Sequence, residues 1–192
     1  LCRFDGQRVT MASQMAEADE TVSSLYSVKS EQATMLSFDT YNYLVHYFGQ
    51  PQGSMSDDPN GTLGGDYEFI ISSASAERIE LKGKKYGNRI VMKALSEDQT
   101  WKQYLTKIKK VEDDAFFYEY DLLMDGLYTG QMLRSNYTFI VTYYDEIGKV
   151  HQKTVPFMFT ADGMRFHEPV TIDGQTMQNF VWKNELISFV CT

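Results

Sequence analysis

Carboxylate and amide side chains gather in one loop of the chain, where they could bind a metal ion. Residues 57–61 read Asp-Asp-Pro-Asn-Gly, and Asp66 and Glu68 follow. Oxygen ligands around a glycine turn are typical of calcium sites, but the calcium-loop spacing with its terminal bidentate glutamate is absent. We therefore expect a solvated acidic loop and no cofactor, with a bound calcium ion as the alternative.

Tyrosines precede this loop and could bind a ligand of another kind. An exposed tyrosine offers a flat apolar face with a polar edge, which suits the weakly hydrophobic face of a sugar ring. Long loops on a rigid β scaffold are also where binding residues concentrate. We predict a ligand site between residues 41 and 67. Its candidate residues are Tyr41, Tyr43, Tyr47, Asp57, Asp58, Asn60 and Asp66. If the tyrosines instead plug the end of a barrel, they belong to the core.

No residue pattern points to catalysis. The histidines His46, His151 and His167 fall on different predicted elements, without the short helical pairing of a zinc site. The chain contains no Gly-x-Ser-x-Gly elbow, phosphate-binding loop or dinucleotide fingerprint. We assign no catalytic residue and no metal ligand, and we favour a protein that is not an enzyme.

The charge of the chain limits its partners. Its 18 basic and 26 acidic residues give a net charge of -8, which argues against sequence-independent binding to nucleic acid or to an anionic membrane. The one basic run, at residues 107–110, should lie at the end of a helix and complement the helix dipole.

The cysteines stand at opposite ends of the chain. Leu1-Cys2 could end a lipoprotein signal, but Arg3-Phe4-Asp5-Gly6 follows at once as strand and turn, so we interpret Cys2 as a strand residue. Cys2 and Cys191 are expected to be two buried thiols, or else a disulfide that joins the first and last strands.

A sequence pattern that occurs twice predicts the architecture. Residues 4–38 and 159–189 each begin with a strand and an Asp-Gly turn, whose glycine accepts positive φ, and continue with a return strand and two further short strands. This order is the signal for a β-meander. We expect the hairpins at Asp5-Gly6 and Asp162-Gly163 to occupy equivalent positions in two superposable lobes.

Two helices interrupt the strands. Residues 41–48 show helical spacing after Asp39-Thr40, which can cap them. A Ser96–Gln99 capping box precedes an apolar stripe formed by Trp101, Tyr104, Leu105, Ile108 and Val111. Residues 116–124 are predicted as a strand, on which one of two neighbouring aromatic side chains must face outward.

The predicted fold is therefore all-β with two short helices. Two related β-meander lobes, each able to curl into a barrel of the lipocalin type, should be joined by the amphipathic helix. The expected boundaries are residues 1–95 for the first lobe, 96–111 for the helix and 112–192 for the second lobe.

Residues 63–71 (Leu-Gly-Gly-Asp-Tyr-Glu-Phe-Ile-Ile) and 81–92 resemble a family of uncharacterised surface lipoproteins from gut Gram-negative anaerobes. The Phe-Asp-Gly hairpin at Phe4 and residues 36–42 match in the same order, so the resemblance is close over most of residues 1–112 and looser beyond. Members often accompany outer-membrane glycan-uptake systems, and the family has no assigned catalytic residues.

The resemblance implies an outer-membrane lipoprotein on the cell surface or the periplasmic face, with a glycan or uptake proteins as partners. Membrane contact is expected only through a lipid anchor that these residues do not include. We expect a non-catalytic module of a nutrient-uptake system that binds a glycan or a partner protein. The alternatives are a β-barrel carrier of a small apolar ligand and, third, a hydrolase.

Overall fold

The chain forms two compact units, each built on one sheet. The computed structural model describes residues 1–30, 33–51, 63–96, 98–145, 147–172 and 174–192. The units are Leu1–Lys102 and Gln103–Thr192. Each contains a seven-stranded antiparallel sheet in which strands consecutive in sequence are neighbours. The predicted all-β class, with two β-meander lobes and two helices, is confirmed.

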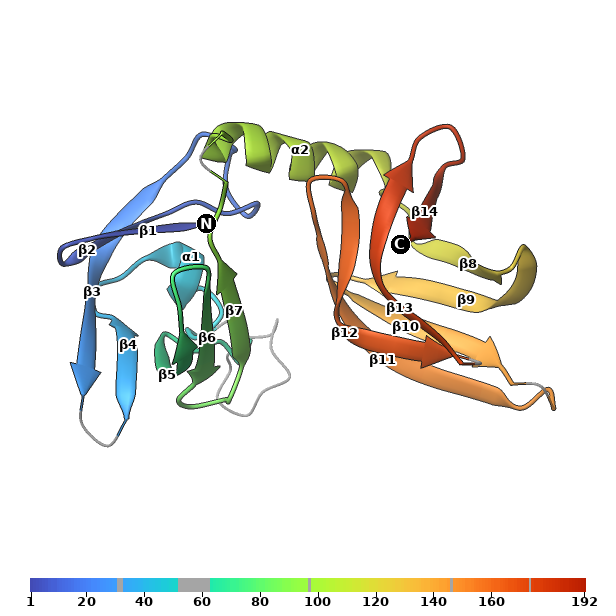
Figure 1. Ribbon diagram of the computed structural model, residues 1–192, viewed down its shortest axis with the longest axis horizontal. Coiled ribbons are helices and arrows are strands. Elements are labelled where there is room, and N and C mark those ends of the chain that lie inside the picture. The colour runs from blue at the N-terminus through green and yellow to red at the C-terminus, as the bar shows by residue number, and fades with distance from the viewer. Residues whose placement is uncertain (31–32, 52–62, 97, 146, 173) are drawn as a thin grey trace. The chain divides into compact units, whose positions relative to one another are not determined.

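The first unit bends at its third strand. Its strands are β1 (Cys2–Asp5), β2 (Arg8–Met11), β3 (Val22–Ser30), β4 (Thr34–Phe38), β5 (Glu68–Ala74), β6 (Arg78–Gly83) and β7 (Arg89–Lys93), with helix α1 (Tyr43–His46) between β4 and β5 (Figure 1). Leu25 pairs with Arg8 of β2, whereas the next residue, Tyr26, pairs with Phe38 of β4. Because β3 exchanges one neighbour for the other along its length, the sheet curls.

The curl of the first unit encloses a small apolar core. Leu36, Phe38 and Phe69 meet Val9 and Leu81 there, and each of these residues is buried. The rings of Phe38 and Phe69 lie edge to face at 6.2 Å. Val45 of α1 packs against this core, so the short helix docks on the concave side of the sheet.

The second unit curls further. Its elements are α2 (Trp101–Asp114), which begins in the first unit, and β8 (Glu119–Met124), β9 (Leu127–Ser135), β10 (Thr138–Tyr144), β11 (Val150–Phe159), β12 (Gly163–Ile172), β13 (Gln175–Lys183) and β14 (Ser188–Cys191). Tyr120 of β8 lies 5.8 Å from Phe189 of β14, ring to ring, so side chains of the two edge strands meet. The ribbons of β8 and β14 lie next to each other in Figure 1. Gln175 also donates to Asp125 at 3.0 Å. The sheet therefore forms a half-barrel.

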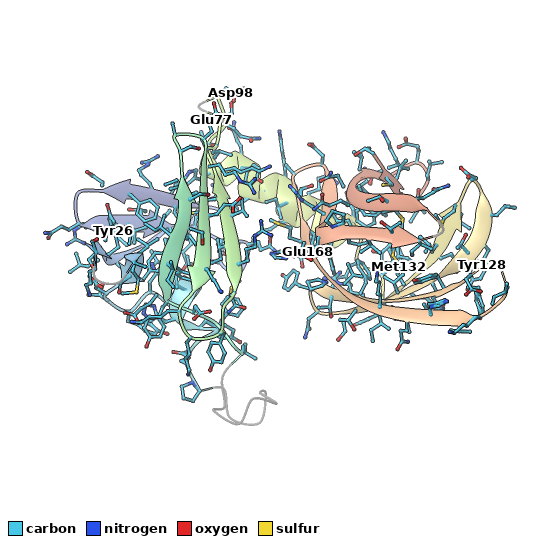
Figure 2. All side chains as sticks on the ribbon, turned by 60° about the horizontal axis from the view of Figure 1, so that its bottom comes forward. Tyr26, Glu77, Asp98, Tyr128, Met132 and Glu168 are labelled. Atoms are coloured by element: carbon cyan, nitrogen blue, oxygen red, sulfur yellow. The ribbon has the colours of Figure 1, made fainter. Side chains whose placement is uncertain are left out.

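Phenylalanine rings fill the concave side of this half-barrel. Phe139 and Phe157 stack at 4.3 Å, and Phe166 lies 4.7 Å from Phe180. Met132 of β9 is buried among the inward side chains, whereas Tyr128 stands exposed near the tip of the β8–β9 hairpin (Figure 2). Of the apolar stripe predicted for the helix, Leu105, Ile108 and Val111 are buried, whereas Trp101 and Tyr104 are half-buried.

Arg134 holds the end of α2 on the second sheet. Its side chain is only 9% exposed, and its guanidinium lies 3.4 Å from Oε1 of Glu112 on α2. The rings of Phe116 and Phe159 flank it at 5.0 and 5.1 Å, a cation–π geometry. A buried charge is tolerated where a counter-charge and aromatic faces replace water, and Arg134 has both.

The equivalence predicted for the two Asp-Gly hairpins is wrong. The first joins β1 and β2, the first two strands of its sheet, whereas the second joins β11 and β12, the fourth and fifth strands of the other sheet. Gly6 has the expected positive φ of 57°. Gly163 is instead a strand residue opposite Val181, and a Cβ there would lie 2.0 Å from the carbonyl oxygen of Phe180. The glycine of the same dipeptide thus allows a tight turn in one sheet and a close approach of two strands in the other.

Both helix caps differ from the prediction. Asn42, and not Asp39-Thr40, caps α1, while Thr40 accepts a hydrogen bond from the backbone of Leu25. Helix α2 begins only at Trp101, and the Ser96 hydroxyl bonds to Asp98. Helix α2 continues to Asp114, so the basic run at 107–110 lies before the last turn and cannot complement the dipole as predicted.

Two further local predictions need correction. Phe116, Phe117 and Tyr118 precede β8 in an exposed connection and are not strand residues. Both cysteines are free, and only Cys2 is partly buried, because Cys191 is exposed. Burial raises the pKa of the Cys2 thiol.

Replacing Gly163 with Ala should lower the free energy of unfolding of the second unit by about 1–3 kcal/mol, because the added methyl group meets backbone that must shift. Ala161→Ser adds one heavy atom to the same turn and should change stability by less than about 0.5 kcal/mol. Urea unfolding measures both. Equal stability of the two variants would contradict the close contact assigned to Gly163.

Candidate functional site

Aromatic rings lie in a row beside α1 in the first unit. The rings of Tyr41 and His46 are 5.5 Å apart, and the ring of Tyr67 stacks on His46 at 5.0 Å with an interplanar angle of 18°. Tyr41 is 64% exposed and Tyr67 is 45% exposed. The Tyr41 hydroxyl reaches Oε1 of Gln50 at 3.3 Å. This aromatic row (Tyr41, His46 and Tyr67) therefore presents tyrosine faces to solvent with polar groups at their edges.

Asn42 fixes one end of the aromatic row. It is fully buried, and its side-chain oxygen accepts a hydrogen bond from the Leu44 backbone at 3.1 Å. Its amide nitrogen donates to the Ser24 hydroxyl of β3 at 3.1 Å. Nδ1 of His46 lies 3.0 Å from the Asn42 carbonyl oxygen. The helix start, the histidine ring and the sheet are thus tied together at one residue.

Asp66 fixes the other end, next to Tyr67. Its carboxylate is 7% exposed and accepts hydrogen bonds from the backbone of Lys85 and Tyr86 at 2.7 and 3.1 Å and from the Asn88 side chain at 2.9 Å. A Cβ at Gly83 would lie 1.8 Å from Oδ2 of Asp66, so this strand position has no room for a side chain. Predicted as a ligand-binding residue, Asp66 here organises the β6–β7 turn.

The other predicted residues lie outside the aromatic row. Tyr43 is half-buried, and its hydroxyl donates to Glu20, a bond that raises the pKa of Tyr43. Tyr47 packs edge to face on Phe48 at 5.4 Å. Asp57, Asp58 and Asn60 fall outside the residues that the structure describes, so the calcium alternative stays a prediction.

Of the residues predicted for the site between residues 41 and 67, Tyr41 belongs to the aromatic row and Asp66 lies beside it, and their binding of a ligand stays a prediction. Sequence reasoning missed His46 and the role of Tyr67. The spacing of Asn42 and His46, four residues apart on a helix, was the available signal that the two side chains meet. The stacking of His46 on Tyr67 joins helix α1 to the residue before β5, far along the chain, and no local pattern encodes that contact.

Each unit also contains an open hollow. In the first unit, a hollow of about 440 Å³ lies where β3 leaves β2, lined by Gln7, Tyr26 and Asp39 among others. In the second, a hollow of about 220 Å³ has Trp182 as its aromatic wall, with Lys107 and Asp162 at its rim. The Trp182 indole donates to Oδ1 of Asn184 at 2.5 Å. Part of the basic run on α2 thus lines a small polar and aromatic hollow.

A histidine and a carboxylate meet in the β10–β11 turn. Nε2 of His151 lies 2.8 Å from Oδ2 of Asp145, and the other oxygen of Asp145 accepts hydrogen bonds from the backbone of Ile147 and Lys149. The pair closes a hairpin. Within the described ranges, no group of three or more His, Cys, Asp and Glu side chains is placed to hold a metal ion. None of the helices described there has the length and apolarity needed to cross a membrane.

The buried cap should control the stability of the first unit. Asn42→Ala removes the acceptor for the Leu44 amide and the donor to buried Ser24, and should lower the free energy of unfolding by about 1–2 kcal/mol. Ser24→Ala removes only the hydrogen bond from the Asn42 amide to Ser24, and should therefore lower the free energy of unfolding by less. Chemical denaturation of the two variants and of the double variant yields the coupling energy. Unchanged stability of Asn42→Ala would contradict the role given to this cap.

The Asp145 carboxyl should titrate below its ordinary pKa of about 3.9. The hydrogen bond from His151 is the main cause, and the Lys149 amide adds to it. A lowered pKa in the folded state means that the contribution to stability is present above about pH 4 and is lost as the pH falls through the folded-state pKa. Carbon-detected NMR measures the titration. His151→Gln should move the Asp145 pKa upward, and an unchanged value in that variant would contradict the assignment.

Comparison with known proteins identifies the chain at the level of a family. Curated proteins yield no match, and solved structures yield none. A family model does match, over residues 1–184, and it describes a domain of unknown function. The match covers both units almost completely, and the chain therefore belongs to the DUF4302 family.

Proposed function

We propose that this protein is a non-catalytic binding module that captures a carbohydrate chain at the aromatic row. The observation that carries the proposal is the pair of exposed tyrosine faces, Tyr41 and Tyr67, held on either side of one histidine ring. A pyranose presents its C–H groups to such a face and its hydroxyls to the polar rim. Gln50 and the tyrosine hydroxyls supply that rim.

The rigidity of the aromatic row supports this function. Ordering a flexible side chain on binding costs about 0.5–1.5 kcal/mol, a cost that preorganised groups avoid. Asn42 holds the helix side of the row, and Asp66 holds the segment that bears Tyr67. Trp182 in the second unit, with polar groups around it, offers a second aromatic surface of the same character.

The cellular setting follows from the resemblance of residues 63–71 and 81–92. We place the protein at the outer membrane of a Gram-negative anaerobe, on the cell surface or the periplasmic face, anchored by a lipid outside these residues. There it works with the proteins of a nutrient-uptake system, and the captured glycan is passed on to them.

Two other functions are less well supported. A carrier of a small apolar ligand needs an open interior, whereas stacked phenylalanines such as Phe139 and Phe157 occupy the concave side of the second unit. A hydrolase needs an acid/base pair beside a substrate cleft, whereas Asp145 and His151 close a hairpin turn. We rank the carrier second and the hydrolase third.

Alanine at Tyr41 should weaken glycan binding by about 1–3 kcal/mol, as the loss of an aromatic anchor does. Because the Tyr41 side chain is mostly exposed, the melting temperature of the Tyr41→Ala variant should stay close to that of the wild type. The Tyr41→Ala/Tyr67→Ala variant should lose binding, while Tyr41→Phe keeps the ring and most of the affinity. A glycan array finds the ligand, and calorimetry measures each variant against it.

The control for this experiment is Tyr144→Ala. Tyr144 is exposed to a degree similar to Tyr67 but belongs to the second unit and is not part of the aromatic row. Its replacement should leave glycan affinity unchanged. An undiminished affinity of the Tyr41→Ala/Tyr67→Ala variant would exclude the aromatic row as the binding site.

A further inference from the structure

The outward face of β6 and β7 concentrates positive charge on an acidic protein. Side chains alternate along a strand, so Arg78, Glu80 and Lys82 share one face of β6. Their partners on β7 are Lys93, Val91 and Arg89 in turn. The opposite face of β6 carries Leu81, which is buried in the core. We call the four outward cations Arg78, Lys82, Arg89 and Lys93 the basic face.

The register of the basic face sets like charges against each other. Arg78 is directly opposite Lys93, and Lys82 is directly opposite Arg89. Like charges in directly opposed positions destabilise a strand pair, and opposite charges or polar side chains would serve a purely structural face better. The arrangement therefore costs stability and points to a role in binding.

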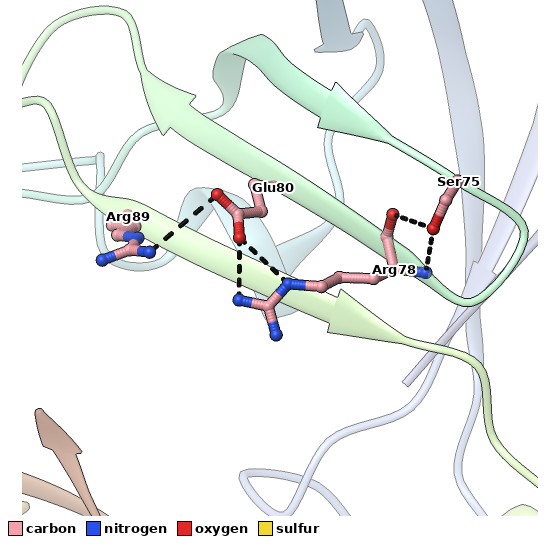
Figure 3. Close-up of polar contacts among 4 residues, drawn as sticks. All are labelled: Ser75, Arg78, Glu80 and Arg89. Carbon is pink, nitrogen blue, oxygen red and sulfur yellow. Dashed lines mark hydrogen bonds and ion pairs between the residues drawn. The ribbon is translucent and has the colours of Figure 1, made fainter.

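Glu80 is the counter-charge within the basic face, and both of its carboxylate oxygens face arginine side chains. Its Oε1 accepts hydrogen bonds from Nε and a terminal nitrogen of Arg78 at 2.9 and 2.7 Å (Figure 3). Its Oε2 faces Arg89 at 3.9 Å. The hydrogen bond from Arg78 lowers the pKa of Glu80, so the carboxylate stays ionised and holds both guanidinium groups in place.

The lysines of the basic face are left without such a partner. Among the described residues, no carboxylate lies within ion-pair distance of Lys82 or Lys93, and both lysines are exposed. Counting the face alone, four positive charges surround one negative charge. β7 is also the last strand of its sheet, so a ligand can approach the face from its open edge.

We propose that the basic face binds an acidic polysaccharide, with sugar carboxylates or sulfates at the two cationic pairs. Arg78 and Lys82 are separated by about 13 Å along the strand, and Glu80 lies between them and repels an anion at the midpoint. A ligand with spaced charges fits this pattern. Double-stranded DNA carries one charge per about 1.7 Å of helix axis and a single strand one per about 3.4 Å, so nucleic acid meets strong repulsion from a chain of net charge -8. A polyuronate carries its charges on separate sugar rings and meets less repulsion.

The inference takes its ligand class from the carbohydrate proposal, but its residues are separate from the aromatic row. The test variant is Lys82→Gln/Lys93→Gln, which leaves the Arg78–Glu80–Arg89 contacts in place. Lys149→Gln/Lys153→Gln removes the same charge from exposed positions of the second unit and is the matched control. The probes are polygalacturonate, dextran sulfate, neutral dextran and a single-stranded oligonucleotide, in calorimetry at about 50 and about 300 mM salt.

Wild type and control should bind at least one of the two acidic polysaccharides at low salt, and the Lys82→Gln/Lys93→Gln variant should bind it about tenfold more weakly. The higher salt concentration should weaken the interaction because screening shortens the reach of each charge. Binding of polygalacturonate would indicate a preference for carboxylate groups, and binding of dextran sulfate a preference for sulfate groups. Neutral dextran should show no difference between the variants.

Three results would overturn the proposal: no binding of either acidic polysaccharide by wild type, equal weakening in the test and control variants, or oligonucleotide binding as tight as polysaccharide binding. The last result would reveal a general attraction to polyanions. If the basic face binds no acidic polysaccharide, the proposal for the aromatic row still stands. A glycan whose affinity falls on replacement of Tyr41 and Tyr67, but not of Lys82 and Lys93, would show that the two sites are independent.

Discussion

One buried carboxylate organises the part of the first unit that carries both proposed binding surfaces. Among the residues that the structure describes, Asp66 is the one buried acidic side chain. An ionised group away from water must be compensated by hydrogen bonds, and the backbone of the β6–β7 turn supplies them. The neighbouring residue, Tyr67, belongs to the aromatic row, and the turn itself connects the two strands of the basic face. Both proposed binding surfaces thus depend on the same carboxylate, and Gly83 lacks a side chain to make room for it.

The second unit is organised differently, around aromatic packing. Phenylalanines from β10, β11, β12 and β13 contact one another across the concave side, and edge strands β8 and β14 meet through Tyr120 and Phe189. Arg134 sits among these rings with Glu112 and fastens α2. A core of this kind stabilises a scaffold but leaves little polar surface for recognition. At the rim, Trp182 and its polar neighbours form the small hollow.

The fold was predictable from sequence because a meander is a local pattern. Alternating apolar residues and turn signals define each strand, and the turns lie between neighbouring strands of the sheet. The Asp-Gly repeat led to a wrong prediction of equivalent hairpins because glycine is needed for a different reason in each. Gly6 adopts a positive φ, whereas Gly163 leaves room for the backbone of the neighbouring strand. The prediction of the α1 cap was wrong for a related reason. Asn42 is the cap residue because its side chain also bonds to buried Ser24 of β3, and the residues next to Asn42 in sequence do not reveal that contact. Contacts across the sheet, such as His46 on Tyr67 and Asp66 on the β6–β7 turn, depend on the register of distant strands and could not be read from spacing.

The central claim is that a carbohydrate lies against the aromatic row. Its most direct test is an NMR titration in which the ring signals of Tyr41, His46 and Tyr67 are followed while an oligosaccharide selected on a glycan array is added. The account predicts saturable shifts of these rings, with the signals of exposed Tyr128 and Tyr144 in the second unit unchanged. Saturable binding that leaves Tyr41 and Tyr67 unshifted would contradict it.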